Sequence, residues 1–236
     1  DEGVYAGLAE IFAEVVEIFP DDFVHVGGDE VNPSWWSDNA QATAFIAAHQ
    51  LGDVRGLQNY FLQRLCKILQ TLGRQVIGWD EVLHPDVPNC VIQNWRGMST
   101  LDRALALNRD CIVSAPFYLD LFFPADMHYG FDPEGDQAEL LAMEDQLGQD
   151  IRLQHVAKAL AWTQQWREGA ITLDANQTEA KVLGGEACLW AELVDSQSLM
   201  PRLWSRLPAV AEVFWSNIER PISQDQVADL YRRLIF

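Results

Sequence analysis

The chain has 236 residues, of which 49% are hydrophobic, so it is long enough to build a substantial core in one or two domains. Its 16 Lys and Arg against 35 Asp and Glu give a formal net charge of −19, spread along the chain; this argues against nucleic acid and anionic membranes as partners, because both bind concentrated basic surface. No run approaches the roughly 20 apolar residues of a membrane span.

The chain begins at Asp1 without a methionine and leads almost at once into a helical pattern, so we expect the true N-terminus to lie elsewhere. No basic segment followed by an apolar one marks a secretory signal. The four cysteines, Cys66, Cys90, Cys111 and Cys188, lack Cys-x-x-Cys spacing and accompanying histidines, which argues against a metal site. A Cys90–Cys111 bridge is an alternative because both residues open predicted strands, but buried free thiols are the expected state.

Helical and strand patterns alternate along the chain. The predicted elements, in order, are a helix over 4–19, a strand in 23–31, helices over 38–50 and 54–72, strands in 75–81 and 91–97, a helix over 100–108, a strand in 111–120, helices over 137–147 and 152–168, a strand in 182–192, and helices over 199–215 and 224–235. The expected caps and breaks are Gly73 as a C-cap, Ser99 or Thr100 as an N-cap, Pro208 as a kink, and Ser223 with Gln226 as a capping box.

The predicted strands are nearly continuously apolar, which is typical of a parallel sheet covered by helices in an α/β fold. Two architectures fit this pattern: an open doubly wound sheet, or part of a (β/α)8 barrel. Residues 121–181 depart from the rhythm but stay rich in Leu, Ala and Trp and contain no Gly/Ser linker. We therefore expect a single domain over residues 1–236 with an insertion at about 121–181.

Polar and aromatic residues follow the predicted strands, and the carboxyl ends of parallel strands meet at one functional edge. The first strand stops at two glycines and presents Asp29 and Glu30, which act either as a catalytic pair or only as caps of the next helix. No Gly-x-Gly-x-x-Gly or phosphate loop appears, which argues against a nucleotide. Tryptophans and acids at successive strand ends favour a carbohydrate, because flat rings stack on sugar faces and carboxylates accept hydrogen bonds from hydroxyls.

Five motifs, taken together and in this order, resemble the β-N-acetylhexosaminidases of glycoside hydrolase family 20. They are His25-x-Gly27-Gly28-Asp29-Glu30, Trp79-Asp80-Glu81, Ala115-Pro116-Phe117-Tyr118-Leu119-Asp120, Gly184-Gly185-Glu186-Ala187-Cys188-Leu189-Trp190-Ala191-Glu192, and Pro201-Arg202-Leu203-Trp204-Ser205-Arg206-Leu207-Pro208-Ala209-Val210-Ala211-Glu212. The resemblance covers nearly the whole chain apart from residues 121–181.

The resemblance implies a (β/α)8 TIM-barrel fold in which the Asp-Glu pair ends strand four. The chain would then hold about five parallel strands, the family's strands four to eight, as a partial barrel. A whole barrel takes about 250 residues or more, which agrees with this count. We expect such a fragment to be inactive or feeble by itself, because residues from the early strands also bind the sugar in this family. Its open barrel edges are expected to invite self-association.

The implied chemistry is substrate-assisted, since this family is one of the known exceptions to the two-carboxylate scheme of glycosidases. The substrate's own 2-acetamido oxygen attacks the anomeric carbon and forms an oxazolinium-like intermediate. Glu30 would be the general acid and later the base, which requires a raised pKa that apolar neighbours can provide. Asp29 would stay ionised and hold the acetamido N–H, and Tyr118 would donate a hydrogen bond to the acetamido carbonyl oxygen.

The resemblance also implies a set of residues that bind the sugar. Trp79, Trp95 and Trp190 are the candidate walls of the pocket, with Trp190 as its floor, and Asp120 and Glu192 are the candidate ligands of the sugar hydroxyls. For each tryptophan the alternative is packing in the core.

Four further residues have simpler interpretations. His25 is expected to be a hydrogen-bonded structural residue, and Glu186 a buried, paired carboxylate that supports the strand ends. Arg202 and Arg206 either lie on a helix surface or pair with acids of the barrel.

The leading hypothesis is a retaining exo-β-N-acetylhexosaminidase that needs no cofactor and acts on N-acetylhexosamine-terminated oligosaccharides or glycoconjugates. A non-catalytic carbohydrate-binding remnant of such a domain is the alternative. A metal-dependent hydrolase with Asp29 and Glu30 as ligands is a third, weakened by the absence of histidine at ligand spacing.

Overall fold

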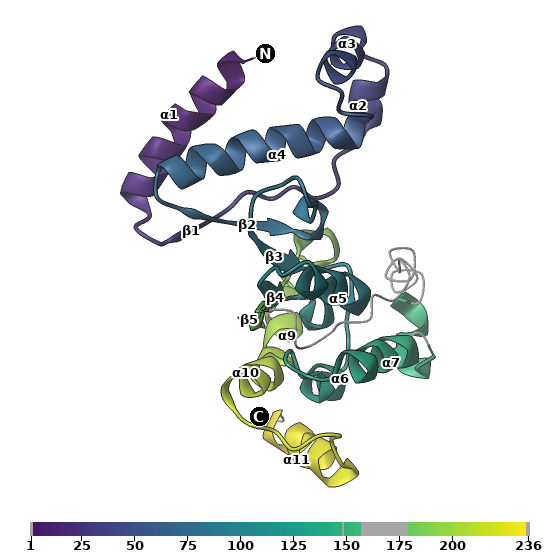
Figure 1. Ribbon diagram of the computed structural model, residues 1–236. Coiled ribbons are helices and arrows are strands. Elements are labelled where there is room, and N and C mark those ends of the chain that lie inside the picture. The colour runs from purple at the N-terminus through teal and green to yellow at the C-terminus, as the bar shows by residue number, and fades with distance from the viewer. Residues whose placement is uncertain (1, 148, 157–178, 235–236) are drawn as a thin grey trace. The chain divides into compact units, whose positions relative to one another are not determined.

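The computed structural model describes residues 2–147, 149–156 and 179–234 (Figure 1). Its strands are β1 (Phe23–His25), β2 (Gln75–Trp79), β3 (Val91–Asn94), β4 (Cys111–Val113) and β5 (Val182–Gly185). They form one five-stranded parallel sheet in the order β1-β2-β3-β4-β5, with α-helices between successive strands except β2 and β3, which are joined through a short 3-10 turn. A strand order that follows the chain order is what consecutive β/α units of a barrel produce, so the predicted fold class, a partial (β/α)8 barrel, is confirmed.

The chain divides into two compact units, Asp1–Gln93 and Asn94–Phe236. The helices of the first unit are α1 (Gly3–Ile18), α2 (Ser34–Ser37), α3 (Ala40–Ala48), α4 (Val54–Thr71) and the 3-10 turn η1 (Asp80–Val82). The described helices of the second unit are α5 (Met98–Ala106), η2 (Ala115–Phe117), α6 (Ala125–Gly130), α7 (Gln137–Leu147), η3 (Ile151–Val156), η4 (Ala191–Leu193), α9 (Leu199–Trp204), α10 (Leu207–Trp215) and α11 (Gln224–Leu234).

Helix α4 supplies the core of the first unit. Leu62, Leu65, Cys66 and Leu69 recur at i, i+3, i+4 and i+7 and are all buried, and the helix packs against β2 and α1. Asp53 begins the helix, because its carboxylate accepts hydrogen bonds from the backbone amides of the first turn.

The end of α4 and the state of the cysteines match the sequence predictions. Gly73 follows α4 with a φ of 73°, a left-handed conformation that glycine adopts without strain, so the predicted helix end is confirmed. All four cysteines are free and buried, as expected.

Helix α1 presents apolar side chains to solvent. None of its residues is buried, and Ile11 and Ile18 are 58% and 70% exposed. Within the described part of the chain β1 pairs only with β2, and it forms one edge of the sheet. The predicted open edge and apolar surface are therefore present, while self-association stays a prediction.

The second unit packs its helices around β4 and β5. Helix α10 lies against α6 and buries Val210 and Val213, and α5 packs on β4. Phe214 of α10 touches the chain next to Gly185, where an added Cβ would lie 2.4 Å from the phenyl ring. The strand end that leads toward Trp190 is thus held closely against α10.

Two local predictions in the second unit were wrong. The helix expected from residue 100 begins at Met98, so Ser99 and Thr100 lie within its first turn and neither is its N-cap. The backbone amide of Met98 donates instead to the carboxylate of Glu144 on α7. A long-range partner had taken the role of a local cap, which a local pattern cannot indicate.

The second error concerns residues 199–215, which form two helices and not one kinked helix. The chain breaks at Ser205 and Arg206, and Pro208 lies in the first turn of α10, a position that tolerates its missing N–H. The capping box of Ser223 and Gln226 is confirmed by both of its hydrogen bonds. The helix expected over 137–147 is α7, and the one over 152–168 falls largely outside the described residues.

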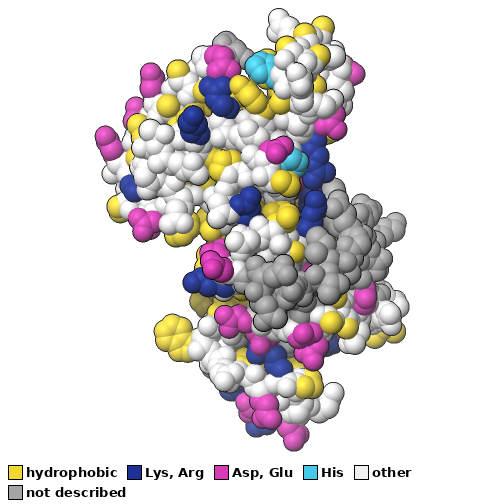
Figure 2. Space-filling model, viewed as in Figure 1, with side chains coloured by type: hydrophobic (Ala, Val, Ile, Leu, Met, Phe, Trp, Pro, Cys, Tyr) yellow, Lys and Arg dark blue, Asp and Glu magenta, His cyan; other side chains and the backbone are white. Residues whose placement is uncertain are grey.

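Figure 2 shows acidic side chains scattered over the drawn face, among neutral side chains and a few cationic ones. This dispersion agrees with a negative charge that is spread along the chain. Among the described residues, no helix combines the length and the hydrophobicity that crossing a bilayer requires.

Candidate active site

The segment after β1 carries the predicted acid pair on an unusual backbone. Gly27 and Gly28 have φ of 69° and 105°, values that favour glycine, and Glu30 follows with a φ of 49°. A non-glycine residue in that region costs about 1–3 kcal/mol and persists only where neighbouring structure enforces it. The side chains of Asp29 and Glu30 are both exposed.

Strand β2 and His25 hold the start of this segment. The backbone amide of Trp79 donates to the carbonyl oxygen of Gly27 at 3.0 Å, and the amide of Gly27 donates to Nδ1 of His25 at 3.0 Å. The imidazole also lies edge-on to the indole of Trp79, with ring centroids 4.9 Å apart. His25 therefore supports the backbone, which agrees with its predicted structural role, and it brings the half-buried Trp79 close to the acid pair.

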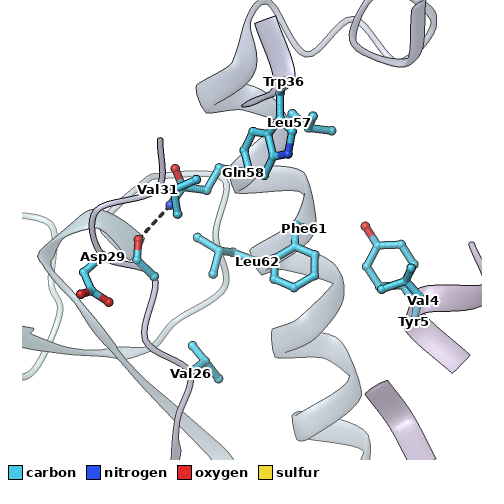
Figure 3. Close-up of a pocket in the computed structure, with 11 residues that line it drawn as sticks. Val4, Tyr5, Val26, Asp29, Val31, Trp36, Leu57, Gln58, Phe61 and Leu62 are labelled. Atoms are coloured by element: carbon cyan, nitrogen blue, oxygen red, sulfur yellow. Dashed lines mark hydrogen bonds between the residues drawn. The ribbon is translucent and has the colours of Figure 1, made fainter. Parts of the chain in front are cut away.

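A cavity of about 410 Å³ lies beside Asp29 (Figure 3). Its lining residues are Val4, Tyr5, Val26, Gly28, Asp29, Val31, Trp36, Leu57, Gln58, Phe61 and Leu62. The walls are mainly apolar side chains of α1 and α4, and Asp29 is the one predicted site residue among them. Since sugar recognition needs groups that bind hydroxyls, this cavity differs from the sugar pocket that the sequence predicts.

In the second unit, backbone pairing brings together the predicted residues that follow β4 and β5. Tyr118 forms a parallel bridge with Cys188, and the amide of Leu119 donates to the carbonyl oxygen of Cys188 at 2.7 Å. Two residues further along each segment, the amide of Trp190 donates to Oδ1 of Asp120 at 3.4 Å. Tyr118, Asp120 and Trp190 thus belong to one cluster.

Asp120 is the most buried acid of this cluster, with 6% of its surface exposed. Burial raises the pKa of its carboxyl above the ordinary value, and the charge of Glu192 acts in the same direction, while the amide of Trp190 and the charge of Arg202 oppose it. This electrostatic interaction places Glu192 near Asp120. Glu192 itself is exposed, and the indole of Trp190 is 43% exposed, which argues against core packing for Trp190.

Two arginines of the last sequence motif support the backbone of Asp120, Arg202 directly and Arg206 through Arg202. The guanidinium of Arg202 donates to the carbonyl oxygen of Asp120 and stacks over the ring of Phe122 at 3.8 Å. Arg206 is 4% exposed, and its Nε donates to the carbonyl oxygen of Arg202 at 3.1 Å. Of the two interpretations of these arginines, the surface one is therefore wrong for Arg206.

His128 supports the turn that carries Tyr118, a role that sequence reasoning missed. It is fully buried on α6, and its Nδ1 lies 2.8 Å from the carbonyl oxygen of Pro116, which identifies Nδ1 as the donor. Its ring lies near those of Phe117 and Phe123. The sequence offered one signal, a histidine between apolar residues, but did not indicate its partner.

Two remaining predictions concern Trp95 and Glu186. Trp95 is half-buried just after β3. Glu186, expected to be buried, is exposed, because it follows β5, which has a strand neighbour on one side only within the described sheet. In the part of the chain that the structure describes, no three His, Cys, Asp or Glu side chains come together as a possible metal site. The catalytic and binding roles of the predicted residues stay predictions.

Comparison with known proteins decides the family. Residues 1–218 match the sequence model of the family described as "Glycosyl hydrolase family 20, catalytic domain". The chain belongs to this family. Family 20 relatives include the β-hexosaminidase subunit beta of Felis catus, which is 33% identical over 238 residues, and the β-hexosaminidase subunit alpha of Bos taurus, which is 32% identical over 223 residues. These alignments cover 98% and 90% of this chain and confirm the resemblance predicted from its motifs.

The chain spans less than two fifths of the length of these relatives, 38% of the cat subunit and 36% of the bovine one. Among solved structures, the Flavobacterium johnsoniae chitobiase of family 20 is similar, with a TM-score of 0.74 and 28% identity. The match covers 99% of this chain and 32% of the chitobiase chain. The described part of this chain therefore has the family-20 fold.

Proposed function

We propose that the protein containing this chain is a retaining exo-β-N-acetylhexosaminidase, which removes terminal N-acetylhexosamine from oligosaccharides or glycoconjugates. The observation that carries the proposal is the match to the family-20 catalytic domain together with the Asp29-Glu30 pair at the carboxyl end of β1. The names of the relatives, hexosaminidase and chitobiase, support the same class of substrate.

The first step breaks the glycosidic bond. The 2-acetamido oxygen of the substrate attacks the anomeric carbon, the bond to the leaving-group oxygen breaks, and Glu30 gives its proton to that oxygen. Asp29 accepts a hydrogen bond from the acetamido N–H and balances the positive charge of the resulting oxazolinium ring. Tyr118 donates to the acetamido oxygen and orients it before attack.

The second step releases the sugar. Glu30, now a carboxylate, takes a proton from water, and the water oxygen bonds to the anomeric carbon. The bond between that carbon and the acetamido oxygen breaks, which opens the oxazolinium ring. Two inversions at the same carbon leave the β configuration unchanged, so the enzyme retains configuration and returns to its starting protonation state.

The second unit supplies groups that suit a sugar ring. The cluster of Asp120, Trp190 and Glu192 joins two carboxylates to an exposed indole, which matches the hydroxyls and the apolar face of a pyranose. Trp79 and Trp95 would form further walls, since each lies directly at the end of its strand.

The decisive experiment replaces the acid in the full-length protein. Glu30→Gln should lower turnover of an aryl N-acetylglucosaminide by about 10²–10⁴-fold, because general acid catalysis contributes that much. Glu134→Gln, which changes an exposed acid in the second unit, is the matched control and should stay active. Near-normal turnover by Glu30→Gln would refute the assignment.

A second substrate tests the internal nucleophile. An aryl β-glucoside, which carries a hydroxyl in place of the acetamido group, should not be hydrolysed. Calorimetry with N-acetylglucosamine, carried out beside these assays, tests the alternative of a non-catalytic remnant. Such a remnant would bind the sugar, but the wild-type protein would hydrolyse neither substrate.

A further inference from the structure

The two peptide groups that flank Asp29 are each held by one long side chain. Nε2 of Gln58 donates to the carbonyl oxygen of Gly28 at 2.9 Å, in the peptide before Asp29 (Figure 3). The backbone amide of Glu30, in the peptide after Asp29, donates to Oε1 of Glu81 at 3.1 Å. The backbone is therefore anchored on both sides of Asp29, the first residue of the predicted catalytic pair.

Both anchors rest on firmly packed elements. Gln58 lies on α4, one turn before the buried Leu62. Glu81 lies in η1 between Asp80 and Val82, which are 6% and 0% exposed. Each anchor therefore holds the backbone that follows β1 in a fixed place relative to a packed element.

The segment needs such anchors, because its conformation is not one that the chain adopts by preference. Gly28 and Glu30 both have positive φ, and Glu30 bears the Cβ that makes this region unfavourable. Without a partner for its amide, Glu30 would be expected to relax toward a commoner conformation and turn its carboxyl group away. The hydrogen bond to Glu81 opposes this relaxation directly.

We propose that Gln58 and Glu81 are positioning residues that fix the direction in which Asp29 and Glu30 present their carboxyl groups. The inference rests on the proposed function, in which Glu30 protonates the leaving oxygen. Neither residue needs to touch the substrate, since both act through the backbone. Their loss should therefore affect proton transfer more than substrate binding.

The variants to compare in the full-length protein are Gln58→Met and Glu81→Met, which keep the chain length of the side chain and remove the polar group. Glu81→Gln keeps an oxygen that can accept the amide of Glu30 and should rescue the loss. Gln70→Met changes an exposed glutamine on the same helix as Gln58 and is the matched control. Thermal unfolding checks that each variant folds, and the two anchors test the proposal independently of one another.

The readout is a series of aryl N-acetylglucosaminides whose phenols range from strongly to weakly acidic. A misplaced general acid matters most when the leaving group is poor, because a good leaving group departs without a proton. We expect Gln58→Met and Glu81→Met to lose about 10- to 100-fold in kcat on the weakly acidic phenols, with little change in KM and a smaller loss on the acidic ones. Glu81→Gln and Gln70→Met should follow the wild type.

Hydrogen exchange of the peptide covering residues 27–31 gives a readout that needs no activity, and Glu81→Met should make its exchange faster. An equal loss in kcat across the phenol series, or no loss in either Met variant, overturns the inference. The proposed function still stands in that case, provided that Glu30→Gln is inactive. If Glu30→Gln is active, the proposed function fails and the inference fails with it.

Discussion

Removing the imidazole of His128 should make the stability of the second unit less sensitive to acid. His128 is fully buried, and the loss of hydration lowers its pKa from 6.5 to about 4; the charge of Arg206 acts in the same direction, while the carbonyl of Pro116 and the charge of Asp126 oppose it. The native state therefore holds a neutral imidazole at a pH where the unfolded chain is already protonated.

The sign and size follow from proton linkage. Between pH 6.5 and about 4 the unfolded state binds one more proton at this site than the native state, so the free energy of unfolding falls as the pH is lowered through this range. At about 1.4 kcal/mol for each unit of pKa difference, the total loss is on the order of 3 kcal/mol. Above pH 6.5 both states are neutral at this site, and the contribution to the pH dependence disappears.

His128→Phe is the suitable replacement, because a phenyl ring fits between Phe117 and Phe123 and does not titrate. It also loses the hydrogen bond to Pro116, which should cost about 1 kcal/mol at every pH. Urea unfolding of both proteins at several pH values from 7 to 4 measures the difference, and the carboxylates that the two proteins share cancel from it. Two parallel stability curves would refute the assignment of a neutral, buried His128.

Three further changes should have defined effects. Asp53→Ala should lower the free energy of unfolding by about 1 kcal/mol, measured by urea unfolding, since it removes the cap of α4, while Asp53→Asn should keep most of it. Gly78→Ala should destabilise by about 1–3 kcal/mol in the same assay, because its Cβ would lie 2.2 Å from Val82, and a neutral result would contradict the close packing. In the full-length enzyme Arg202→Met should lower kcat/KM by roughly tenfold through displacement of Asp120, with partial recovery in Arg202→Lys; unchanged kinetics would show that Asp120 needs no such support.

The elements of the fold were predictable where one local pattern determined them. Helix α4 has a regular apolar face, a capping Asp53 and a terminal Gly73, and its predicted bounds of 54–72 agree with Val54–Thr71 to within one residue. The start of α5 was not predictable in this way. Its cap is the carboxylate of Glu144, which is 46 residues away in sequence, and no local signal connects the two.

The same distinction applies to the candidate site. Asp29, Glu30 and Tyr118 could be named from the sequence because each follows a strand within a recognisable motif. The residues that hold these strand ends could not, because their partners are backbone groups. Backbone groups are the same at every position of the chain, so a contact to one leaves no sequence pattern that could be read for Gln58 or His128.

The backbone after each of these strands needs such partners for a physical reason. A parallel strand loses its ladder of hydrogen bonds where it ends, and the next residues would otherwise move freely while carrying the groups that must be held most firmly. Side chains from neighbouring elements replace the ladder there: Gln58 and Glu81 after β1, and His128 and Arg202 after β4. Substitutions at these four positions should therefore reduce turnover more than their effects on stability would suggest, because a displacement of about 1 Å at a reacting group can cost 10²-fold in rate.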